Sequence, residues 1–151
     1  MTKAKLQPYT PEDRATCLNI FDGNVPKYFG AEERAEFEAF LDNLPSPYFT
    51  LVLDNEIIGC GGYGNRNGNN DGIGFFCWGM IENAHHKQGH GTILAETRIE
   101  AMRKNPNVIS VQLNTSQHTA PFYARFGFDI VKTTKDGFSN GLDDVEMRLV
   151  F

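Results

Sequence analysis

The chain has 151 residues, a length that suits one domain, of which 40% are hydrophobic and 22% charged, ordinary values for a globular protein. Its net charge of -5 excludes the basic surface of a general nucleic-acid binder. The first residues contain no apolar stretch of signal-peptide type, and the longest apolar run, 73–81, is too short to span a bilayer. We therefore expect a cytoplasmic protein that binds neither nucleic acid nor membrane.

The predicted elements begin with a short strand over 5–9 and a helix over 11–21, for which Thr10 is a suitable N-cap. Apolar residues at helical spacing predict a second helix over 31–44, and the loop before it, 24–30, either lines a substrate pocket or plugs the core. The order of all elements predicts a mixed α/β fold around one sheet. The later elements are strands over 48–53, 56–63 and 73–81, with a hairpin loop over 64–72, then a helix over 89–103, a strand over 108–113, a helix over 120–126, and strands over 128–133 and 145–150 that flank a turn-rich loop over 135–144.

Three cysteines, Cys17, Cys60 and Cys77, are too widely spaced to indicate a zinc site, and we expect no metal. Cys60 and Cys77 lie in apolar runs, which favours core positions over nucleophiles. Free thiols in a reducing compartment are the simplest interpretation.

The strand 73–81, the helix after it and the next strand form a βαβ unit, so the two strands are expected to be parallel. Their connection brings a helix N-terminus to a strand end, where unpaired N–H groups and the helix dipole attract anions. Gly89 and Gly91 allow a ligand close to the backbone, and Lys87 and Thr92 supply further donors. This arrangement suits a pyrophosphate, although the spacing matches neither GxGxxG nor a P-loop.

Residues 86–91, His-Lys-Gln-Gly-His-Gly, resemble the Gln/Arg-x-x-Gly-x-Gly/Ala loop of the GNAT-type N-acetyltransferases. In that family the loop wraps the pyrophosphate of coenzyme A. His86 stands where the family usually has Gln or Arg. The difference affects one side-chain contact and leaves the backbone cradle intact.

A second segment, 114–128, resembles the signature in which a strand end precedes a helix that ends in F-Y-x-x-x-G-F. Phe122, Tyr123, Gly127 and Phe128 match that signature. The two motifs occur in the family's order and at a suitable distance, and together with the preceding elements they cover essentially the whole chain.

The resemblance implies a mixed α+β fold: a central, mostly antiparallel sheet with a parallel βαβ crossover and helices on both faces. It implies one N-acetyltransferase domain over 1–151 that moves an acetyl group from acetyl-CoA, its co-substrate, to a primary amine by direct attack without a metal. The acceptor amine belongs to a small molecule or a protein. Members often form dimers, so a homodimer is compatible with the resemblance.

The resemblance also implies site residues. Tyr123 is the expected general acid that protonates the departing thiolate, and a phenol is ordinarily protonated at neutral pH. A backbone N–H near Met80 or Ile81 is expected to polarise the thioester oxygen, while the strand edge pairs with the pantetheine arm. Asn114 contacts the coenzyme or acceptor, or else makes a local turn bond. The expected coenzyme-binding residues are Met80, Ile81, His86, Lys87, Gln88, Gly89, His90, Gly91, Thr92 and Asn114.

The general base is left open. Glu82, His85 and His118 are candidates by position, and water chains also carry protons.

Asp143 and Asp144 either attract a cationic acceptor or lie in a solvated hairpin. Two other functions compete with an enzyme: a non-catalytic acyl-CoA-binding sensor or subunit, and an unrelated α/β domain without coenzyme affinity.

Overall fold

The structure is a computed structural model that describes residues 3–66 and 71–151. Short 3-10 turns precede three of the helices, at Pro11–Asp13, Ala31–Glu33 and Asn83–His85. The remaining elements are β1 (Lys5–Pro8), α1 (Arg14–Gly23), α2 (Arg34–Asp42), β2 (Tyr48–Leu53), β3 (Glu56–Asn65), β4 (Ile73–Ile81), α3 (His90–Arg103), β5 (Ser110–Thr115), α4 (Ala120–Ala124), β6 (Asp129–Ser139) and β7 (Leu142–Val150).

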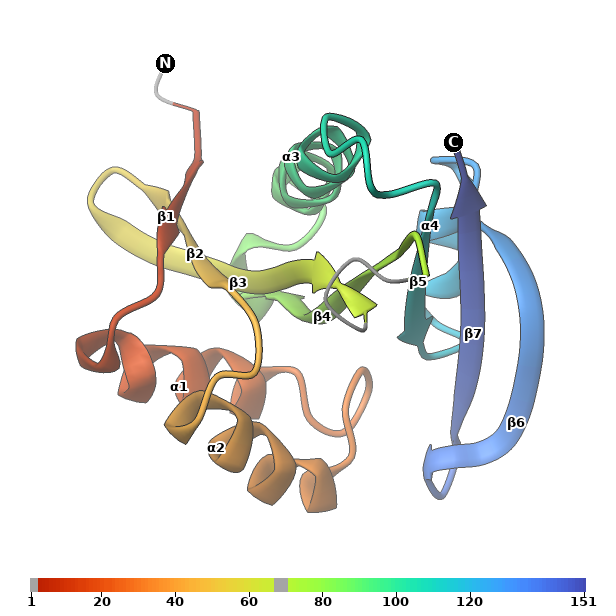
Figure 1. Cartoon of the computed structure of the whole chain (residues 1–151). Coiled ribbons are helices and arrows are strands. Elements are labelled where there is room, and N and C mark those ends of the chain that lie inside the picture. Colours follow the sequence, from red (N-terminus) through yellow and green to blue (C-terminus); the bar gives the residue numbers. More distant parts are fainter. Residues whose placement is uncertain (1–2, 67–70) are drawn as a thin grey trace.

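The strands form one sheet in the order β1-β2-β3-β4-β5-β7-β6 (Figure 1). All neighbours are antiparallel except β4 and β5, which α3 connects as a crossover. Helices α1 and α2 cover one face of the sheet and α3 covers the other. The predicted fold class, a mostly antiparallel sheet with a parallel βαβ crossover and helices on both faces, is confirmed.

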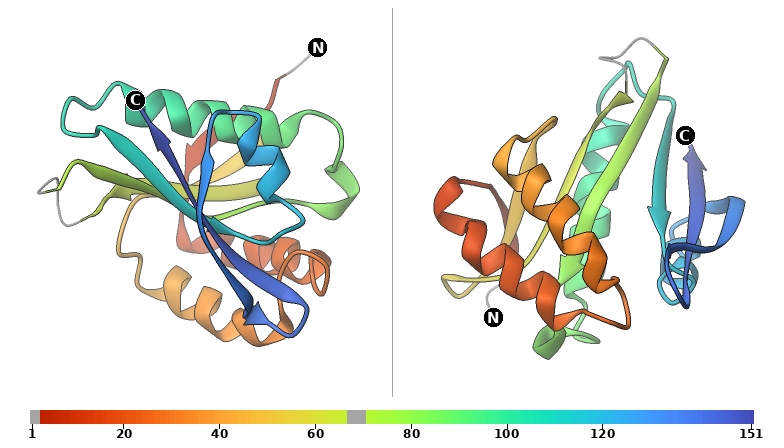
Figure 2. Two further views of the ribbon diagram at one scale, coloured as in Figure 1. Left: turned by 90° about the vertical axis from the view of Figure 1, so that its right-hand side faces the viewer. Right: turned by 90° about the horizontal axis from the view of Figure 1, so that it is seen from below.

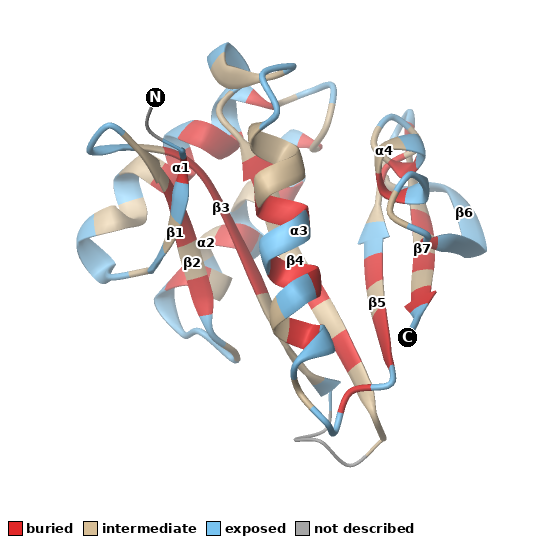
Figure 3. Ribbon diagram, turned by 90° about the horizontal axis from the view of Figure 1, so that it is seen from above, coloured by how far each residue is buried: buried red, intermediate tan, exposed pale blue. Residues whose placement is uncertain are grey.

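Buried residues occur in the helices and in most of the sheet (Figure 3), and they form clusters on both sides of it. Aromatic side chains dominate the side under α1 and α2, where the Phe37 ring lies 4.9 Å from that of Trp78. Ala95, Ile99 and Met102 of α3 pack with residues of β5, β7 and α4 on the other side. The three cysteines are free thiols, and Cys17 and Cys60 are fully buried.

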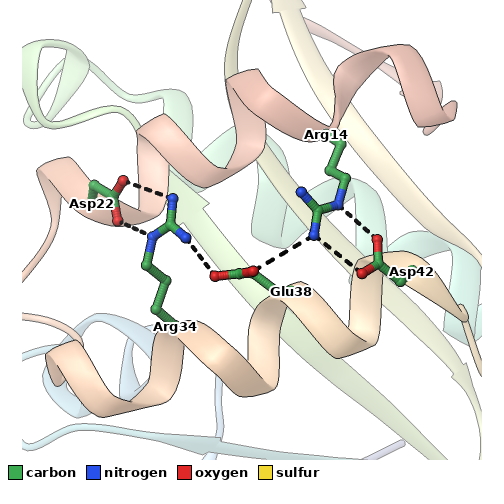
Figure 4. A network of polar contacts seen from close by, with 5 residues as sticks. All are labelled: Arg14, Asp22, Arg34, Glu38 and Asp42. Atoms are coloured by element: carbon green, nitrogen blue, oxygen red, sulfur yellow. Dashed lines mark hydrogen bonds and ion pairs between the residues drawn. The ribbon is translucent and has the colours of Figure 1, made fainter.

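Helices α1 and α2 are joined across their exposed faces by a network of ion pairs (Figure 4). Arg14 of α1 donates to both carboxylate oxygens of Asp42, at 2.7 and 3.1 Å. Arg34 of α2 bonds Asp22 at 2.8 Å and also Glu38 of its own helix. Because the side chains are partly exposed to solvent, each pair contributes little to stability.

Strands β4 and β5 separate soon after they begin. Their parallel pairing covers only Ile73–Phe75 against Ser110–Gln112 in the described part of the chain. Beyond it the two halves of the sheet diverge (Figure 2). The remainder of β4 therefore has one edge without a partner strand from β5.

The prediction of a turn-rich loop over 135–144 is wrong. Strands β6 and β7 continue through it to a tight turn, with Ser139 paired to Leu142. Most of β6 is exposed on both faces, so its sequence lacks the alternation that marks a half-buried strand. The expected hairpin loop 64–72 lies partly outside the described residues, and β3 extends into it as far as Asn65.

Within residues 3–66 and 71–151, no helix has the length and apolar character that crossing a membrane requires.

Candidate active site

A cavity of about 810 Å³ opens where β4 and β5 diverge. Its walls come from the loop before α2, the end of β4, the start of α3, the end of β5 and α4. Gln88 and His90, which the sequence also indicated, are not part of the wall, and the Gln88 amide instead donates to the Ala84 carbonyl. The expected residues that line the cavity are Met80, Ile81, His86, Lys87, Gly89, Gly91, Thr92, Asn114 and Tyr123.

The start of α3 faces this cavity with little side-chain cover. Gly89 has φ +85°, which an L side chain rarely adopts, and a β-carbon there would meet no atom within 4 Å. At Gly91 a β-carbon would come no closer than 3.5 Å to the Phe122 ring. The left-handed backbone accounts for Gly89, and the absence of side chains at both glycines leaves room for a ligand close to the backbone. The free N–H groups of this first turn suit an anion.

His86 turns back toward the end of β4. Its Nε2 lies 2.8 Å from the carbonyl oxygen of Ile81, and because a carbonyl only accepts, Nε2 carries the proton. The imidazole also packs edge-on against Tyr28, with ring centroids 5.3 Å apart. His86 thus ties the glycine loop to the strand and to the loop before α2.

Strand β4 contains an irregularity where it borders the cavity. The pairing with β3 shifts between Cys60 and Gly62, and Trp78 has φ +43°. Such a bulge bends the strand, and backbone strain of this kind is common at functional sites. Met80 and Ile81 follow it and pair with β3 on one side, while no strand of the described residues pairs with their other edge. On that edge the Ile81 carbonyl accepts from His86 and from the Asn24 amide, so the remaining backbone groups are the ones left for a ligand.

Tyr123 of α4 places its ring in the cavity wall, with 9% of the residue exposed. Its hydroxyl oxygen accepts a hydrogen bond of 3.2 Å from Nη2 of Arg98. Asn114 also lines the cavity, and its side chain donates to Asp144 at 2.8 Å. Asn114 therefore makes a cross-strand bond, not the turn bond that the sequence left open.

The end of the cavity under α2 is acidic and aromatic. Glu33 is 6% exposed and accepts the Gly30 N–H at 2.7 Å. Burial raises the pKa of Glu33, and the nearby carboxylates add to the shift while the bond from Gly30 opposes it. Glu36, Phe29 and Trp78 line the same end.

Two of the three candidates for a general base line the cavity. His85 and His118 line the cavity, whereas Glu82 does not and instead bonds His85 Nδ1 at 2.9 Å. Sequence reasoning missed Glu33 and Arg98. The signal for Arg98 was a charge that interrupts the apolar face of α3, four residues after Leu94 and four before Met102.

No group of three or more His, Cys, Asp or Glu side chains in the described residues is arranged to hold a metal ion.

The sequence profile of the acetyltransferase (GNAT) family matches residues 16–128. The chain belongs to the GNAT family. Membership makes it an enzyme of the N-acetyltransferase class, whose general reaction moves an acetyl group from acetyl-CoA to an amine. Among curated proteins, no sequence matches this GNAT chain.

Solved structures share the GNAT fold at low sequence identity. A protein from Desulfovibrio desulfuricans assigned to the GNAT family is 19% identical, with a TM-score of 0.79 over 97% of this chain and 98% of that one. The ribosomal-protein-S18-alanine N-acetyltransferase from Escherichia coli is 14% identical, with a TM-score of 0.78 over 97% and 93%. An aminoglycoside 6'-N-acetyltransferase in complex with coenzyme A is 15% identical, with a TM-score of 0.74 over 97% and 96%.

Proposed function

We propose that this enzyme transfers the acetyl group of acetyl-CoA to a primary amine by direct attack, with residues 1–151 acting as one domain. One observation carries the proposal. A single cavity brings together the open helix start at Gly89, the unpaired edge of β4 and the hydroxyl of Tyr123. These are the three parts that binding and cleaving an acyl-CoA thioester requires.

The coenzyme end is assigned to the start of α3. The backbone N–H groups from Gly89 to Thr92 and the helix dipole would hold the pyrophosphate, and Lys87 adds a positive charge. The pantetheine arm would pair with the edge of β4 beside Met80 and Ile81 that has no partner strand, as an added strand does, although the Ile81 carbonyl is already bonded by His86 and Asn24. An N–H of that edge would polarise the thioester carbonyl.

The acceptor amine would enter from the opposite, acidic end. Glu33 and Glu36 favour a cationic amine, and Phe29 and Trp78 offer aromatic faces to its carbon chain. Neutral amine attacks the carbonyl carbon, and Tyr123 gives its proton to the leaving sulfur. Three points stay predictions: that the amine belongs to a small molecule or a protein, that the enzyme forms a homodimer, and that it is cytoplasmic.

The test combines ligand binding with turnover. Thermal unfolding is measured with acetyl-CoA, CoA, NAD or ATP added separately, and a ligand at about 100 times its Kd stabilises the fold by about 2.7 kcal/mol. CoA release is then followed with spermidine, an aminoglycoside and a peptide that has a free N-terminus, with an N-acetylated peptide as the control.

We expect stabilisation by acetyl-CoA and CoA alone, together with turnover of at least one free amine. Binding without turnover of any amine would favour the acyl-CoA sensor. No stabilisation by either coenzyme form at saturation would contradict the assignment of the cavity.

A further inference from the structure

Arg98 is a buried cation in the wall of the active-site cavity. It extends from α3, lines the cavity and is 1% exposed. Its Nε donates to the Leu94 carbonyl at 3.3 Å and its Nη1 to the Gly62 carbonyl at 3.4 Å. None of the ion pairs found in residues 3–66 and 71–151 includes Arg98.

The neighbouring strands leave room for this guanidinium by carrying glycine. A β-carbon on Gly79, inside the bulge of β4, would lie 2.9 Å from Nη2 and 3.0 Å from Nη1. One on Gly61 of β3 would lie 3.3 Å from Nη1. The Phe76 ring covers the cation, with 4.3 Å between Cζ and the ring centroid. Arg98 therefore occupies a fitted position beside the irregular part of β4.

Such a position is costly for stability. Arginine stays protonated in proteins, and a buried charge without a counter-ion loses its hydration. Carbonyls and an aromatic face compensate only in part, and apolar replacements of buried charges are often neutral or stabilising. A purely structural role therefore explains Arg98 poorly.

The hydrogen bond from Arg98 to Tyr123 places the buried charge beside the phenol oxygen. Nη2 of Arg98 donates to the phenol oxygen at 3.2 Å, so the phenol proton must point away from Arg98. No acceptor for that proton is found within the described part of the chain, and the ring borders the cavity. The proton is thus free for a group inside the cavity.

We propose that Arg98 is a positioning residue for the acid step, which aims the Tyr123 proton at the leaving sulfur and stabilises the phenolate that remains. This inference rests on the proposed function. As the amine N–C bond forms and the C–S bond breaks, sulfur leaves with the electron pair and takes the phenol proton. The proton released from the attacking nitrogen then restores the phenol through water. The unpaired cation beside the oxygen lowers the cost of the negative charge in between.

A double-mutant cycle tests the coupling. Arg98→Met, Tyr123→Phe and the double variant are compared with the parent, using acetyl-CoA and the panel amine that turns over fastest. With Tyr123 present, Arg98→Met should lower kcat about tenfold or more and change the KM for acetyl-CoA less than about twofold. With Phe at residue 123, the same change should alter kcat less than about twofold, because no phenol is left to act through.

Two further measurements separate this role from a structural one. Arg98→Met should keep or raise Tm, since it removes an unpaired buried charge, and Arg98→Lys should recover part of kcat. Arg103→Met is the matched control: it removes an α3 arginine that stacks on Phe151, 4.6 Å from Cζ to the ring centroid, away from the cavity. It should leave kcat unchanged.

Equal losses of kcat in both backgrounds, or a lower Tm together with a higher KM, would overturn the proposal for Arg98 while acetyl transfer itself stood. An unaffected Tyr123→Phe enzyme would overturn the acid step and Arg98 with it. A parent that turns over none of the amines would overturn the proposed function, and this inference would fall with it.

Discussion

Gly30, in the loop before α2, lies directly against Ser139 at the end of β6. A β-carbon on Gly30 would come within 2.6 Å of both Cβ and Oγ of Ser139. Segments more than a hundred positions apart in the sequence thus meet at the acidic end of the cavity, where the neighbouring Phe29 and Phe138 both line it. This contact lies beside the end of the cavity proposed for the acceptor.

Gly30→Ala should force the loop and the hairpin apart. Overpacking of this kind costs about 1–3 kcal/mol of stability, and misplacing a substrate wall should raise the KM for the amine by roughly tenfold. The Kd for CoA, measured by calorimetry, should stay unchanged. Gly23→Ala is the control, because its β-carbon would meet its nearest atom, in Asn83, at 4.0 Å. Similar amine KM values for both variants would contradict the role of the contact.

His86→Ala should weaken coenzyme binding. It removes the 2.8 Å bond to Ile81 and the ring contact with Tyr28, both of which hold the glycine loop in place. We expect the Kd for CoA to rise by roughly tenfold, as one hydrogen bond is worth about 1 kcal/mol and the freed loop must be ordered again on binding. His90→Ala, at the first residue of α3 and outside the cavity wall, should leave the Kd nearly unchanged. The interpretation fails if both variants weaken binding equally.

Gly89→Asp should weaken coenzyme binding more severely. The change strains a backbone of φ +85° and places a negative charge where the pyrophosphate is expected. We expect the Kd for CoA to rise by about a hundredfold or more, from repulsion and loss of close approach together. Gly141→Asp has the same backbone strain, at φ +84°, in the turn between β6 and β7, and should bind CoA normally. Unchanged affinity in the Gly89 variant would remove the pyrophosphate from this helix start.

Glu33→Gln should weaken the binding of cationic acceptors. Glutamine keeps an oxygen that accepts the Gly30 N–H, so the turn survives while the negative charge is lost. The KM for spermidine should rise about tenfold and that for acetyl-CoA should not change. Glu32→Gln, on the exposed side of the same turn, is the control and should have little effect. Equal spermidine KM values in parent and variant would exclude Glu33 from the acceptor site.

The same carboxyl has a consequence for stability. Because burial raises the pKa of Glu33 in the folded state, the folded chain binds its proton more tightly than the unfolded chain does. The stability contributed by this group is therefore lost as the pH rises from the unfolded value through the raised one. Glu33→Gln removes that loss, so its Tm at pH 7 should be no lower than that of the parent. A clearly lower Tm would show that the charge itself stabilises the turn.

Cys77 should react slowly with alkylating reagents although it lines the cavity. Burial raises the pKa of its thiol to about 11, and the nearby Arg98 charge opposes that shift only in part. At pH 8 about one thiol in a thousand is then ionised, and the rate of alkylation by iodoacetamide should rise about tenfold per pH unit up to pH 11. Mass spectrometry of tryptic peptides reports the rate. Fast alkylation of Cys77 at pH 7 would contradict the raised pKa.

The sequence was informative where function depends on short segments. The helix start at Gly89 and the F-Y-x-x-x-G-F segment around Tyr123 each require a particular local geometry, and both occur as expected. The order of the elements could be predicted because apolar residues at helical spacing mark the helices and turn residues mark the ends of the strands. The strand expected over 128–133 corresponds to the first part of β6, and its continuation to Ser139 was missed because an exposed edge strand has no side that must be apolar.

The contacts that organise the site were beyond local patterns. Arg98 and Tyr123 are separated by 25 positions, and only the folded chain shows that one faces the other. Glu33 was read as part of an amphipathic helix, where an acidic first turn is ordinarily solvated. The β6–β7 hairpin comes close to this turn, where Ser139 lies against Gly30 and Asp144 adds to the raised pKa of Glu33. Both residues acquire their properties from segments that are distant in the sequence.

The short pairing of β4 with β5 has a consequence for the lifetime of the protein. In the described part of the chain three residue pairs join the two halves of the sheet, and the packing of α3 residues with those of β5 and β7 adds to the connection between them. An extended substrate bound between β4 and β5 would connect the two halves of the sheet and suppress their local opening. Such opening exposes a chain to proteolysis. The supply of acetyl-CoA would then govern how long the enzyme survives as well as how fast it works.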